Sequence, residues 1–223
     1  MKTTVVIPAK NEERSIGKII SQSRKYAEEI LVVDGHSRDG TARVARRLGA
    51  RVVQDHGLGK GDGIRVGIAE ARGDILVFID ADGSHDPRDI PKLIKPIKQG
   101  RADMVVGSRG MGGSDELHGD VEKLLRMIGS DIILIGINKK FKVNLTDSQN
   151  GYRAVRATAA RAVHLEENIT TIEQEVTIKF LKKGFRISEV PTHEYARSHG
   201  ASVIKLRRVW FRYVWSFLKY LLF

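Results

Sequence analysis

The stretch Ile75-Leu-Val-Phe-Ile-Asp-Ala-Asp-Gly-Ser-His-Asp-Pro87 opens with five apolar residues and then turns acidic. The apolar run predicts a buried strand, which ends at two carboxylates one residue apart, Asp80 and Asp82. Such a pair is costly to bring together unless a cation lies between the carboxylates or water surrounds them. The stretch therefore predicts either a metal site at the end of a core strand or a solvated turn.

The rest of the chain alternates between short apolar runs and segments of helical period. Strands are expected at 3–8, 29–34, 51–54, 74–79, 102–107 and 185–190, and helices at 12–27, 41–48, 62–71, 89–98, 121–135 and 172–183. This alternation predicts an α/β fold, Rossmann-like, with a mostly parallel sheet flanked by helices. In such sheets ligands bind beyond the carboxyl ends of the strands.

Three of the expected strands end in polar clusters, at residues 8–12, 34–41 and 80–82. Because the carboxyl ends of parallel strands share one edge, we expect these clusters to meet. Carboxylates placed there are hard oxygen ligands that suit Mg²⁺ or Mn²⁺ bridging to phosphate oxygens. The position therefore favours a metal site at Asp80 and Asp82 over a solvated turn.

The composition narrows the class of protein and of partner. The 223 residues fit one large domain, and the absence of cysteine excludes disulfides and Cys-ligated metals and fits a reducing, cytoplasmic setting. A net charge of +11 indicates an anionic partner: nucleic acid, a phosphorylated metabolite or a membrane face. We expect no signal peptide, because a strand-like run follows the first residues directly, and no apolar run reaches the roughly 18 residues that span a bilayer.

The glycine-rich segment Gly59-Lys-Gly-Asp-Gly-Ile-Arg-Val-Gly67 suggests contact with an anion. A P-loop is excluded because Lys60 is followed by glycine rather than Ser or Thr. A dinucleotide fingerprint is disfavoured because it belongs in the first strand-turn-helix unit, and here the unit is the third. We expect a flexible turn that places Lys60 and Arg65 beside an anionic ligand; the alternative is a solvated helix start.

Together these motifs resemble a known family. Val5-Val-Ile-Pro-Ala-Lys-Asn-Glu12, Leu31-Val-Val-Asp-Gly-His-Ser-Arg-Asp-Gly-Thr41, the Gly-Lys-Gly turn and Gly73-Asp-Ile-Leu-Val-Phe-Ile-Asp-Ala-Asp82 follow the order and spacing of family-2 glycosyltransferases of GT-A fold. The later motifs look more narrowly like those of dolichyl-phosphate mannose synthases and related polyprenyl-phosphate glycosyltransferases: Val106-Gly-Ser-Arg109, Asp147-Ser-Gln-Asn-Gly-Tyr-Arg153, Glu189-Val-Pro191 and Arg197-Ser-His-Gly-Ala-Ser202.

The resemblance, which covers about residues 3 to 205, implies a role for each matching position. It assigns the nucleotide base and ribose to Pro8, Glu12 and Asp34, with Asp80 and Asp82 placing the divalent cation on the diphosphate. It assigns the acceptor phosphate to Arg109, Arg126 and Arg197. A guanidinium fork suits a pair of phosphate oxygens. The alternative for Arg126 is an ordinary surface charge on a helix.

Several further residues keep open roles. Relatives carry a metal-binding glutamine where this chain has Ser84, so His85 and Asp86 are candidate substitutes. Asp147 would serve as a general base for a sugar hydroxyl, but an acceptor phosphate is already ionised, which favours a turn-ordering role. The roles of Glu175, His193 and His199 are left open, with metal ligation as the less favoured alternative for the two histidines.

The last segment, 205–223, differs from the preceding domain at 1–204. It holds five basic residues, no acidic residue and seven of the chain's fourteen aromatic residues. This composition is typical of an amphipathic helix lying in a membrane interface. The alternative is a terminal helix docked on the domain or on a second subunit.

The sequence thus predicts an inverting, metal-dependent transferase at the cytoplasmic face of a membrane. The sugar, mannose or glucose, would pass from a GDP- or UDP-linked donor to a polyprenyl or dolichyl phosphate. Asp80, Asp82 and Arg109 are the expected catalytic groups. One alternative is a soluble transferase acting on a phosphorylated small molecule or a sugar hydroxyl. A nucleic-acid-binding module is disfavoured, because the aromatic residues gather in one tail and no binding motif is evident.

Overall fold

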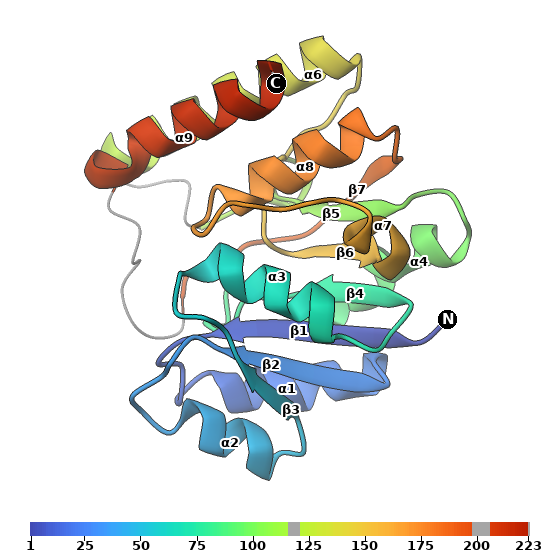
Figure 1. The fold of residues 1–223 in the computed structure, drawn as a ribbon, viewed down its shortest axis with the longest axis vertical. Helices are drawn as coiled ribbons and strands as arrows, with labels where there is room; N and C mark the ends of the chain where they lie inside the picture. Colours follow the sequence, from blue (N-terminus) through green and yellow to red (C-terminus); the bar gives the residue numbers. More distant parts are fainter. Residues whose placement is uncertain (116–120, 198–205, 223) are drawn as a thin grey trace.

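The computed structural model spans the chain, and it describes residues 1–115, 121–197 and 206–222. These ranges form a seven-stranded sheet in the order β3-β2-β1-β4-β6-β5-β7, with helices on both faces (Figure 1). The strands are β1 (Thr3–Ala9), β2 (Glu29–Asp34), β3 (Arg51–Gln54), β4 (Ile75–Phe78), β5 (Met104–Ser108), β6 (Arg153–Arg156) and β7 (Ile187–Pro191). The α-helices are α1 (Ile16–Ser23), α2 (Thr41–Arg47), α3 (Lys60–Glu70), α4 (Ile90–Lys98), α5 (Arg109–Gly112), α6 (Val121–Phe141), α7 (Ala157–Arg161), α8 (Ile172–Lys182) and α9 (Leu206–Leu222). Two 3₁₀ turns are η1 (Arg24–Tyr26) and η2 (Pro87–Asp89).

The sheet is mostly parallel, as predicted, with one exception. β1 pairs in parallel with β2 and β4, β2 with β3, and β5 with β7, whereas β6 is antiparallel to both of its neighbours. Strand β6 was not predicted from the sequence. Its four residues begin and end with arginine, and the apolar character that marks a core strand is confined to its two central positions.

The core lies on both faces of the sheet, because alternate residues of each strand point to opposite sides. On β4, Ile75 and Val77 join one buried cluster with residues of α1 and α4. Leu76 and Phe78 join the other cluster, with residues of α3, α7 and α8. Burial on both faces explains why this strand reads as a continuous apolar run.

Some element boundaries differ from the predicted ones. The helix expected from residue 12 begins at Ile16, because residues 12–15 form a turn in which Ser15 Oγ donates to Glu12 Oε2 (2.6 Å). The helix expected from residue 62 begins at Lys60, which places that lysine in its first turn. The helix expected to end at 135 continues to Phe141.

The C-terminal helix α9 packs against α6 and α8, across the top of the molecule (Figure 1). Ser216 and Tyr220 are buried on its inner side. Lys219 Nζ bonds Glu166 Oε2 (2.6 Å) and fastens the end of the helix to the domain. Helix α9 is therefore docked on the domain through its inner side, and the expected contact of this segment with a membrane interface stays a prediction.

Candidate active site

The loops that follow β1 and β2 lie side by side and are joined by hydrogen bonds. Asn11 N–H donates to Ser37 Oγ (2.9 Å) and Glu12 N–H donates to Thr41 Oγ1 (2.7 Å). Because β4 lies on the other side of β1, its acidic end belongs to the same edge. The prediction that the three polar clusters meet is confirmed.

Two of the expected donor-binding carboxylates lie at this edge. Asp34 is 2% exposed; its Oδ2 accepts from Ser37 N–H (3.3 Å), and its Oδ1 has no partner among the described residues. Burial raises the pKa of Glu12, in spite of its bond from Ser15. A buried carboxylate oxygen without a donor is costly, so Asp34 suits a ligand that brings a hydroxyl or N–H group.

The two aspartates that end β4 have different surroundings. Asp82 is buried, and its Oδ1 accepts from the backbone N–H (3.0 Å) and hydroxyl (2.7 Å) of Ser84. Its Oδ2 lies 3.3 Å from Arg197 Nη1. Asp80 keeps 27% of its side chain exposed and lies 2.8 Å from Lys60 Nζ through Oδ1. Each aspartate therefore has a cationic side chain beside it.

Lys60 is shared between two carboxylates. Its Nζ is 2.8 Å from Asp80 Oδ1 and 3.1 Å from Glu173 Oε1. Burial alone would lower the pKa of Lys60, but the two carboxylates outweigh it and the pKa lies above its ordinary value. Burial likewise opposes ionisation of Asp80, yet the adjacent ammonium keeps the pKa of Asp80 below its ordinary value. Lys60 is thus a charged group beside Asp80 and Glu173, and donor binding by Lys60 stays a prediction.

Arg65, the second cation expected beside the donor, is engaged elsewhere. Its guanidinium bonds the backbone carbonyl of Glu167, Asn168 Oδ1 (2.5 Å) and Asp62 Oδ1 (3.3 Å). These contacts fasten α3 to the loop that precedes α8. Of the two cations, only Lys60 contacts Asp80, and donor binding by Arg65 stays a prediction.

Arg109 forms a two-pronged pair with Asp147. Its Nε and Nη2 lie 2.6 and 3.0 Å from the two carboxylate oxygens, and Nη1 is 3.4 Å from Glu194 Oε2. Asp147 Oδ1 also accepts from the backbone N–H groups of Gln149 and Asn150, as expected of a residue that orders this turn. Burial opposes ionisation of Asp147, but Arg109 holds the pKa of Asp147 below its ordinary value.

The structure shows the surroundings of two of the three arginines assigned to the acceptor phosphate. Arg109 and Arg197 both lie in ion pairs, the second with Asp82. The side chain of Arg126, on α6, lies outside the described residues, as does His199. Acceptor binding by these three residues stays a prediction.

Comparison with known proteins identifies the family. The profile described as glycosyl transferase family 2 matches residues 4–163. This chain belongs to glycosyl transferase family 2. It is 34% identical over 220 residues to the undecaprenyl-phosphate mannosyltransferase of Micrococcus luteus, covering 91% of this chain and 87% of that one. It is 30% identical over 235 residues to the dolichol-phosphate mannosyltransferase of Pyrococcus furiosus, covering 99% of this chain and 64% of the longer relative.

The fold matches solved GT-A structures. Glucosyl-3-phosphoglycerate synthase from Mycobacterium tuberculosis, in complex with Mn²⁺, UDP and glucosyl-3-phosphoglycerate, matches with a TM-score of 0.76 at 22% identity. The match covers 98% of this chain and 79% of that one. The predicted family and fold are both confirmed.

The site residues of this family 2 glycosyltransferase fit a divalent cation that is coordinated partly by protein carboxylates and partly by a substrate. Within the described ranges there is no cluster of three His, Asp or Glu side chains that could hold a metal. Asp80 and Asp82 offer two carboxylates, and Mg²⁺ or Mn²⁺ commonly completes such a set with phosphate oxygens and water. The donor set therefore suits a cation that arrives with a nucleoside diphosphate.

The candidate replacements for a third metal ligand have other partners. His85 is buried and stacked on Tyr152, with Nε2 3.9 Å from Asp80 Oδ2, and burial lowers its pKa. Asp86 caps η2 by accepting from Arg88 N–H (2.8 Å). His193 contacts Gly112 O (3.0 Å) and Asp115 Oδ1 (2.9 Å). Of the three, His85 alone contacts one of the two strand-end aspartates.

Two site residues were missed in the sequence of this glycosyltransferase. Glu173, not Glu175, reaches Lys60, whereas Glu175 accepts from backbone N–H groups of the loop before α8 and from Lys179. Gly151 lies against the same cluster, because a Cβ there would be 2.9 Å from Lys60 Nζ. Residues two positions apart on a helix face different ways, so only one of the two glutamates can enter the site, and the packing of α8 shows which one.

Proposed function

We propose that this glycosyltransferase is an inverting, metal-dependent enzyme that transfers mannose or glucose from a GDP- or UDP-linked donor to a polyprenyl or dolichyl phosphate. The observation that carries the proposal is the pair of carboxylates at the end of β4. Asp80 and Asp82 lie where the donor loops meet, each within 3.3 Å of a cationic side chain. Two carboxylates so placed can hold a divalent cation, and the cation in turn would balance the charge of a diphosphate.

On the donor side, Asp80 and Asp82 would hold the cation, and Pro8, Glu12 and Asp34 the nucleoside. Mg²⁺ or Mn²⁺ bound there would neutralise the charge that develops on the departing diphosphate. Lys60 adds a positive charge beside the same leaving group. The chain itself therefore supplies orientation and charge at the bond that breaks.

On the acceptor side, the proposed step is a single in-line displacement. An acceptor phosphate oxygen forms a bond to the anomeric carbon as the bond from that carbon to the diphosphate breaks, and the electron pair leaves with the nucleoside diphosphate. Configuration inverts. The phosphate is already ionised, so no general base is required. The pairing of Asp147 with Arg109 and the adjacent turn agrees with this.

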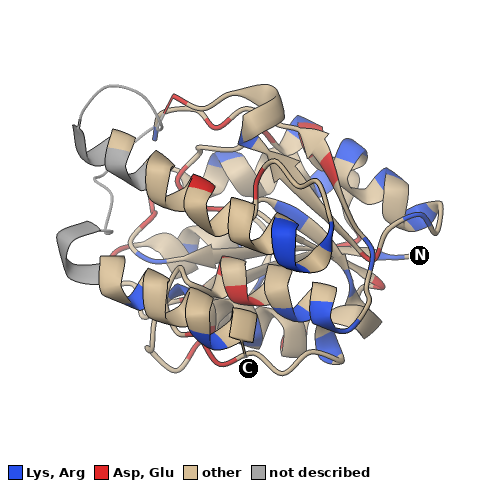
Figure 2. Ribbon diagram, turned by 90° about the horizontal axis from the view of Figure 1, so that it is seen from above, with Lys and Arg blue, Asp and Glu red and all other residues tan. Residues whose placement is uncertain are grey.

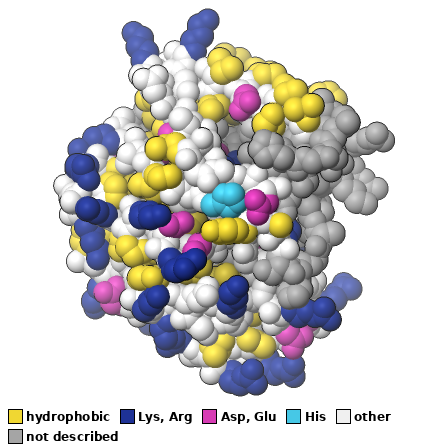
Figure 3. Space-filling model, turned by 180° about the vertical axis from the view of Figure 1, so that it is seen from behind, with side chains coloured by type: hydrophobic (Ala, Val, Ile, Leu, Met, Phe, Trp, Pro, Cys, Tyr) yellow, Lys and Arg dark blue, Asp and Glu magenta, His cyan; other side chains and the backbone are white. Residues whose placement is uncertain are grey.

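A lipid acceptor is supported by the apolar face that α6 and α9 present together. Figure 2 shows the two helices side by side, and the coloured parts of their ribbons carry few charged residues; Figure 3 shows apolar side chains gathered along the upper edge of the molecule, over α6. In the described parts, fourteen large apolar side chains are exposed, and ten of them are on these helices: Leu124, Ile128, Ile132, Ile135, Trp210, Phe211, Val214, Trp215, Leu218 and Leu222. Such a concentration marks a docking surface rather than scattered exposure.

The occupant we propose for this face is a membrane surface. Trp and basic residues on α9 suit the headgroup region of a bilayer. No helix in the described ranges combines the length and apolar content required to cross a bilayer. The mannosyltransferases named above act, by their names, on undecaprenyl phosphate and dolichol phosphate. The proposed location is therefore peripheral, at the cytoplasmic face, where residues 205–223 keep the enzyme close to its acceptor.

The alternative acceptor is a small phosphorylated molecule, as the solved synthase structure holds glucosyl-3-phosphoglycerate. A donor and acceptor screen separates the two. The purified enzyme is offered UDP- and GDP-linked glucose and mannose, with and without Mn²⁺, and either a short polyprenyl phosphate or 3-phosphoglycerate. We expect metal-dependent transfer to the polyprenyl phosphate; transfer to 3-phosphoglycerate alone would refute the lipid acceptor.

The metal site is tested by Asp82→Asn, with the exposed Asp74→Asn as the matched control. Loss of one electrostatic stabiliser slows catalysis by roughly 100-fold or more. We expect that loss for Asp82→Asn and unchanged turnover for Asp74→Asn. Full activity of Asp82→Asn in the presence of Mn²⁺ would contradict the metal assignment.

A further inference from the structure

Lys60 occupies the position that a metal ion would claim at Asp80. It begins α3, and its Nζ contacts both oxygens of Asp80, Oδ1 at 2.8 Å and Oδ2 at 3.1 Å. An ammonium bound to both oxygens of a carboxylate neutralises that group and leaves it little charge to offer a second cation. A divalent cation at Asp80 therefore has to displace Lys60 from its position.

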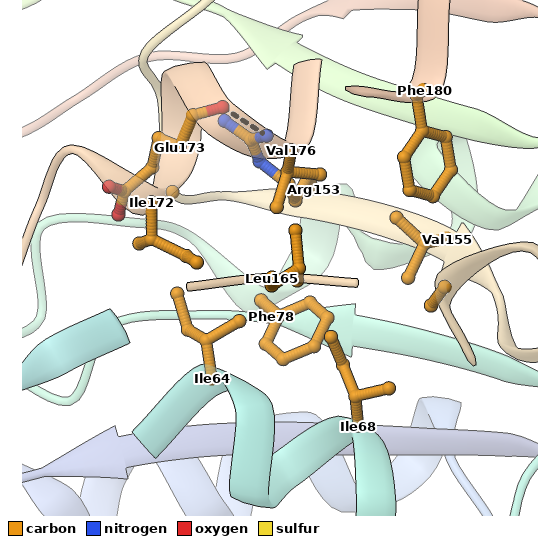
Figure 4. Close-up of a pocket in the computed structure, with 12 residues that line it drawn as sticks. Ile64, Ile68, Phe78, Arg153, Val155, Leu165, Ile172, Glu173, Val176 and Phe180 are labelled. Carbon is orange, nitrogen blue, oxygen red and sulfur yellow. Dashed lines mark hydrogen bonds between the residues drawn. The ribbon is translucent and has the colours of Figure 1, made fainter. Parts of the chain in front are cut away.

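Glu173 provides the displaced ammonium with a second partner. It is 4% exposed, and its Oε1 already lies 3.1 Å from Lys60 Nζ. Its Oε2 is buried and has no hydrogen-bond partner among the described residues. Figure 4 shows the carboxylate turned away from Arg153, whose guanidinium bonds the backbone carbonyl of Glu173 instead (3.1 Å). The carboxylate of Glu173, which already contacts the lysine through Oε1, thus has unused acceptor capacity at Oε2.

The backbone on the other side of Lys60 leaves space for this shift. Gly151 approaches so closely that a Cβ would lie 2.9 Å from Nζ, 3.4 Å from Asp80 Oδ2 and 3.5 Å from Glu173 Oε1. A glycine therefore leaves room for the lysine head between its two carboxylates. Gly61 N–H donates to Asn168 O (2.9 Å) and fixes the first turn of α3, so the movement is confined to the lysine side chain.

We propose that Lys60 is an internal counter-ion for Asp80. When a divalent cation binds to Asp80, the Lys60 ammonium moves to the carboxylate of Glu173, its second partner. The inference rests on the metal dependence proposed above and adds a division of labour. Asp80 takes the cation, and Glu173 holds the ammonium beside the diphosphate, where its charge can act on the leaving group. Glu173 is a positioning residue: it touches Lys60 and acts through it.

This arrangement predicts in which direction each substitution changes the affinity for Mn²⁺. Without the ammonium, Asp80 is free for the metal, so Lys60→Met should bind Mn²⁺ more tightly. Without the Glu173 carboxylate, Lys60 stays on Asp80, so Glu173→Gln should bind Mn²⁺ more weakly. The double variant has no lysine that could stay on Asp80, so the Mn²⁺ affinity of the double variant should match that of Lys60→Met.

The test is the Mn²⁺ dissociation constant of the nucleotide-free enzyme, measured by the electron paramagnetic resonance signal of free Mn²⁺. We expect the dissociation constant to fall roughly tenfold in Lys60→Met and to rise several-fold in Glu173→Gln. A tenfold change corresponds to about 1.4 kcal/mol, which is within the range of coupling energies between residues in contact. Lys92→Met, which removes an exposed lysine paired with Asp89, is the matched control and should leave the constant unchanged. Unfolding midpoints confirm that each variant is folded.

Three results would overturn the proposal. The first is an unchanged Mn²⁺ dissociation constant in Glu173→Gln, and the second is an equal rise of this constant by Glu173→Gln with and without Lys60. The third is a higher Mn²⁺ dissociation constant in Lys60→Met. If Lys60→Met does not fold, a crystal of the unaltered enzyme with Mn²⁺ and nucleoside diphosphate decides. Lys60 Nζ should then contact Glu173 and have left Asp80; a lysine still bound to Asp80 would refute the idea. If the unaltered enzyme binds no Mn²⁺ either with or without nucleoside diphosphate, the proposed metal dependence itself fails.

Discussion

Replacing Asp147 by asparagine should destabilise the protein because it removes the counter-charge of a buried arginine. Asp147 is 6% exposed and Arg109 keeps only 15% of its side chain exposed. The carboxylate accepts from Arg109 N–H, Nε and Nη2 at 3.2, 2.6 and 3.0 Å, and from the N–H groups of Gln149 and Asn150 at 3.0 and 3.1 Å. An amide keeps one acceptor oxygen but turns an NH₂ donor toward the guanidinium.

The expected loss is about 3 to 5 kcal/mol, which is typical when one partner of a buried ion pair is removed. That is a large share of the roughly 5 to 15 kcal/mol by which domains are stable. Glu194 offsets only part of it, because its Oε2 lies 3.4 Å from Arg109 and also accepts from Ser114.

The loss should depend on pH with a definite sign. Because Arg109 lowers the pKa of Asp147 below its ordinary value of 3.8, the unfolded chain takes up this proton before the folded one does. The stabilisation by the pair is therefore complete above about pH 4 and falls as the pH drops through and below that value. The difference between the unaltered protein and Asp147→Asn should be full at pH 7 and smaller at pH 3.5.

Urea unfolding at pH 7, 5 and 3.5 measures this difference, with the exposed Asp74→Asn as the control that should change little. An Asp147→Asn variant that kept its stability at pH 7 would contradict the stabilising role assigned to the ion pair. If the variant remained stable and instead lost the acidic limb of its pH–rate profile, Asp147 would be acting as a general base on the acceptor.

Three further predictions follow, two from glycines and one from the outer face of α9. In Gly61→Ala a Cβ would lie 2.2 Å from a backbone carbonyl oxygen of the loop before α8, so thermal or urea unfolding should show a loss of about 1 to 3 kcal/mol or more. In Gly151→Ala the Cβ would meet the movable end of Lys60, so stability should change by less than about 1 kcal/mol while the Mn²⁺ affinity changes. Trp215→Glu should reduce sedimentation with anionic vesicles several-fold, whereas Leu58→Glu, which alters an exposed leucine outside the two helices, should not; equal binding by both variants would argue against the membrane face.

The sequence predicted the sheet edge well because its signal is local. β1, β2 and β4 are apolar runs that end in polar residues, and parallel pairing of such strands brings their ends together without further information. β6 could not be predicted in the same way. It is a strand because the gap between β4 and β5 accepts it, and Arg153 is tolerated inside because its guanidinium bonds Asn150 O (3.0 Å) and Glu173 O (3.1 Å).

The start of α3 shows the same limit at the site itself. Gly59-Lys-Gly61 has the composition of a loop, yet the helix begins at Lys60. Gly59 adopts φ 122°, and a Cβ at this position would lie 2.5 Å from Asn168 O. The glycines are therefore required by a neighbour more than a hundred positions away in the sequence, and a local pattern cannot report it.

Charge balance at the described site explains why the donor and its cation should be bound together. Four cationic side chains face five carboxylates there: Lys60, Arg109, Arg153 and Arg197 against Asp80, Asp82, Asp147, Glu173 and Glu194. The net charge of +11 is thus not gathered at this cluster, which carries an excess of negative charge. A nucleoside diphosphate would be repelled by such a surface, and a divalent cation would be attracted. Each ligand therefore lowers the electrostatic cost of binding the other, and this coupling is reciprocal by thermodynamic necessity.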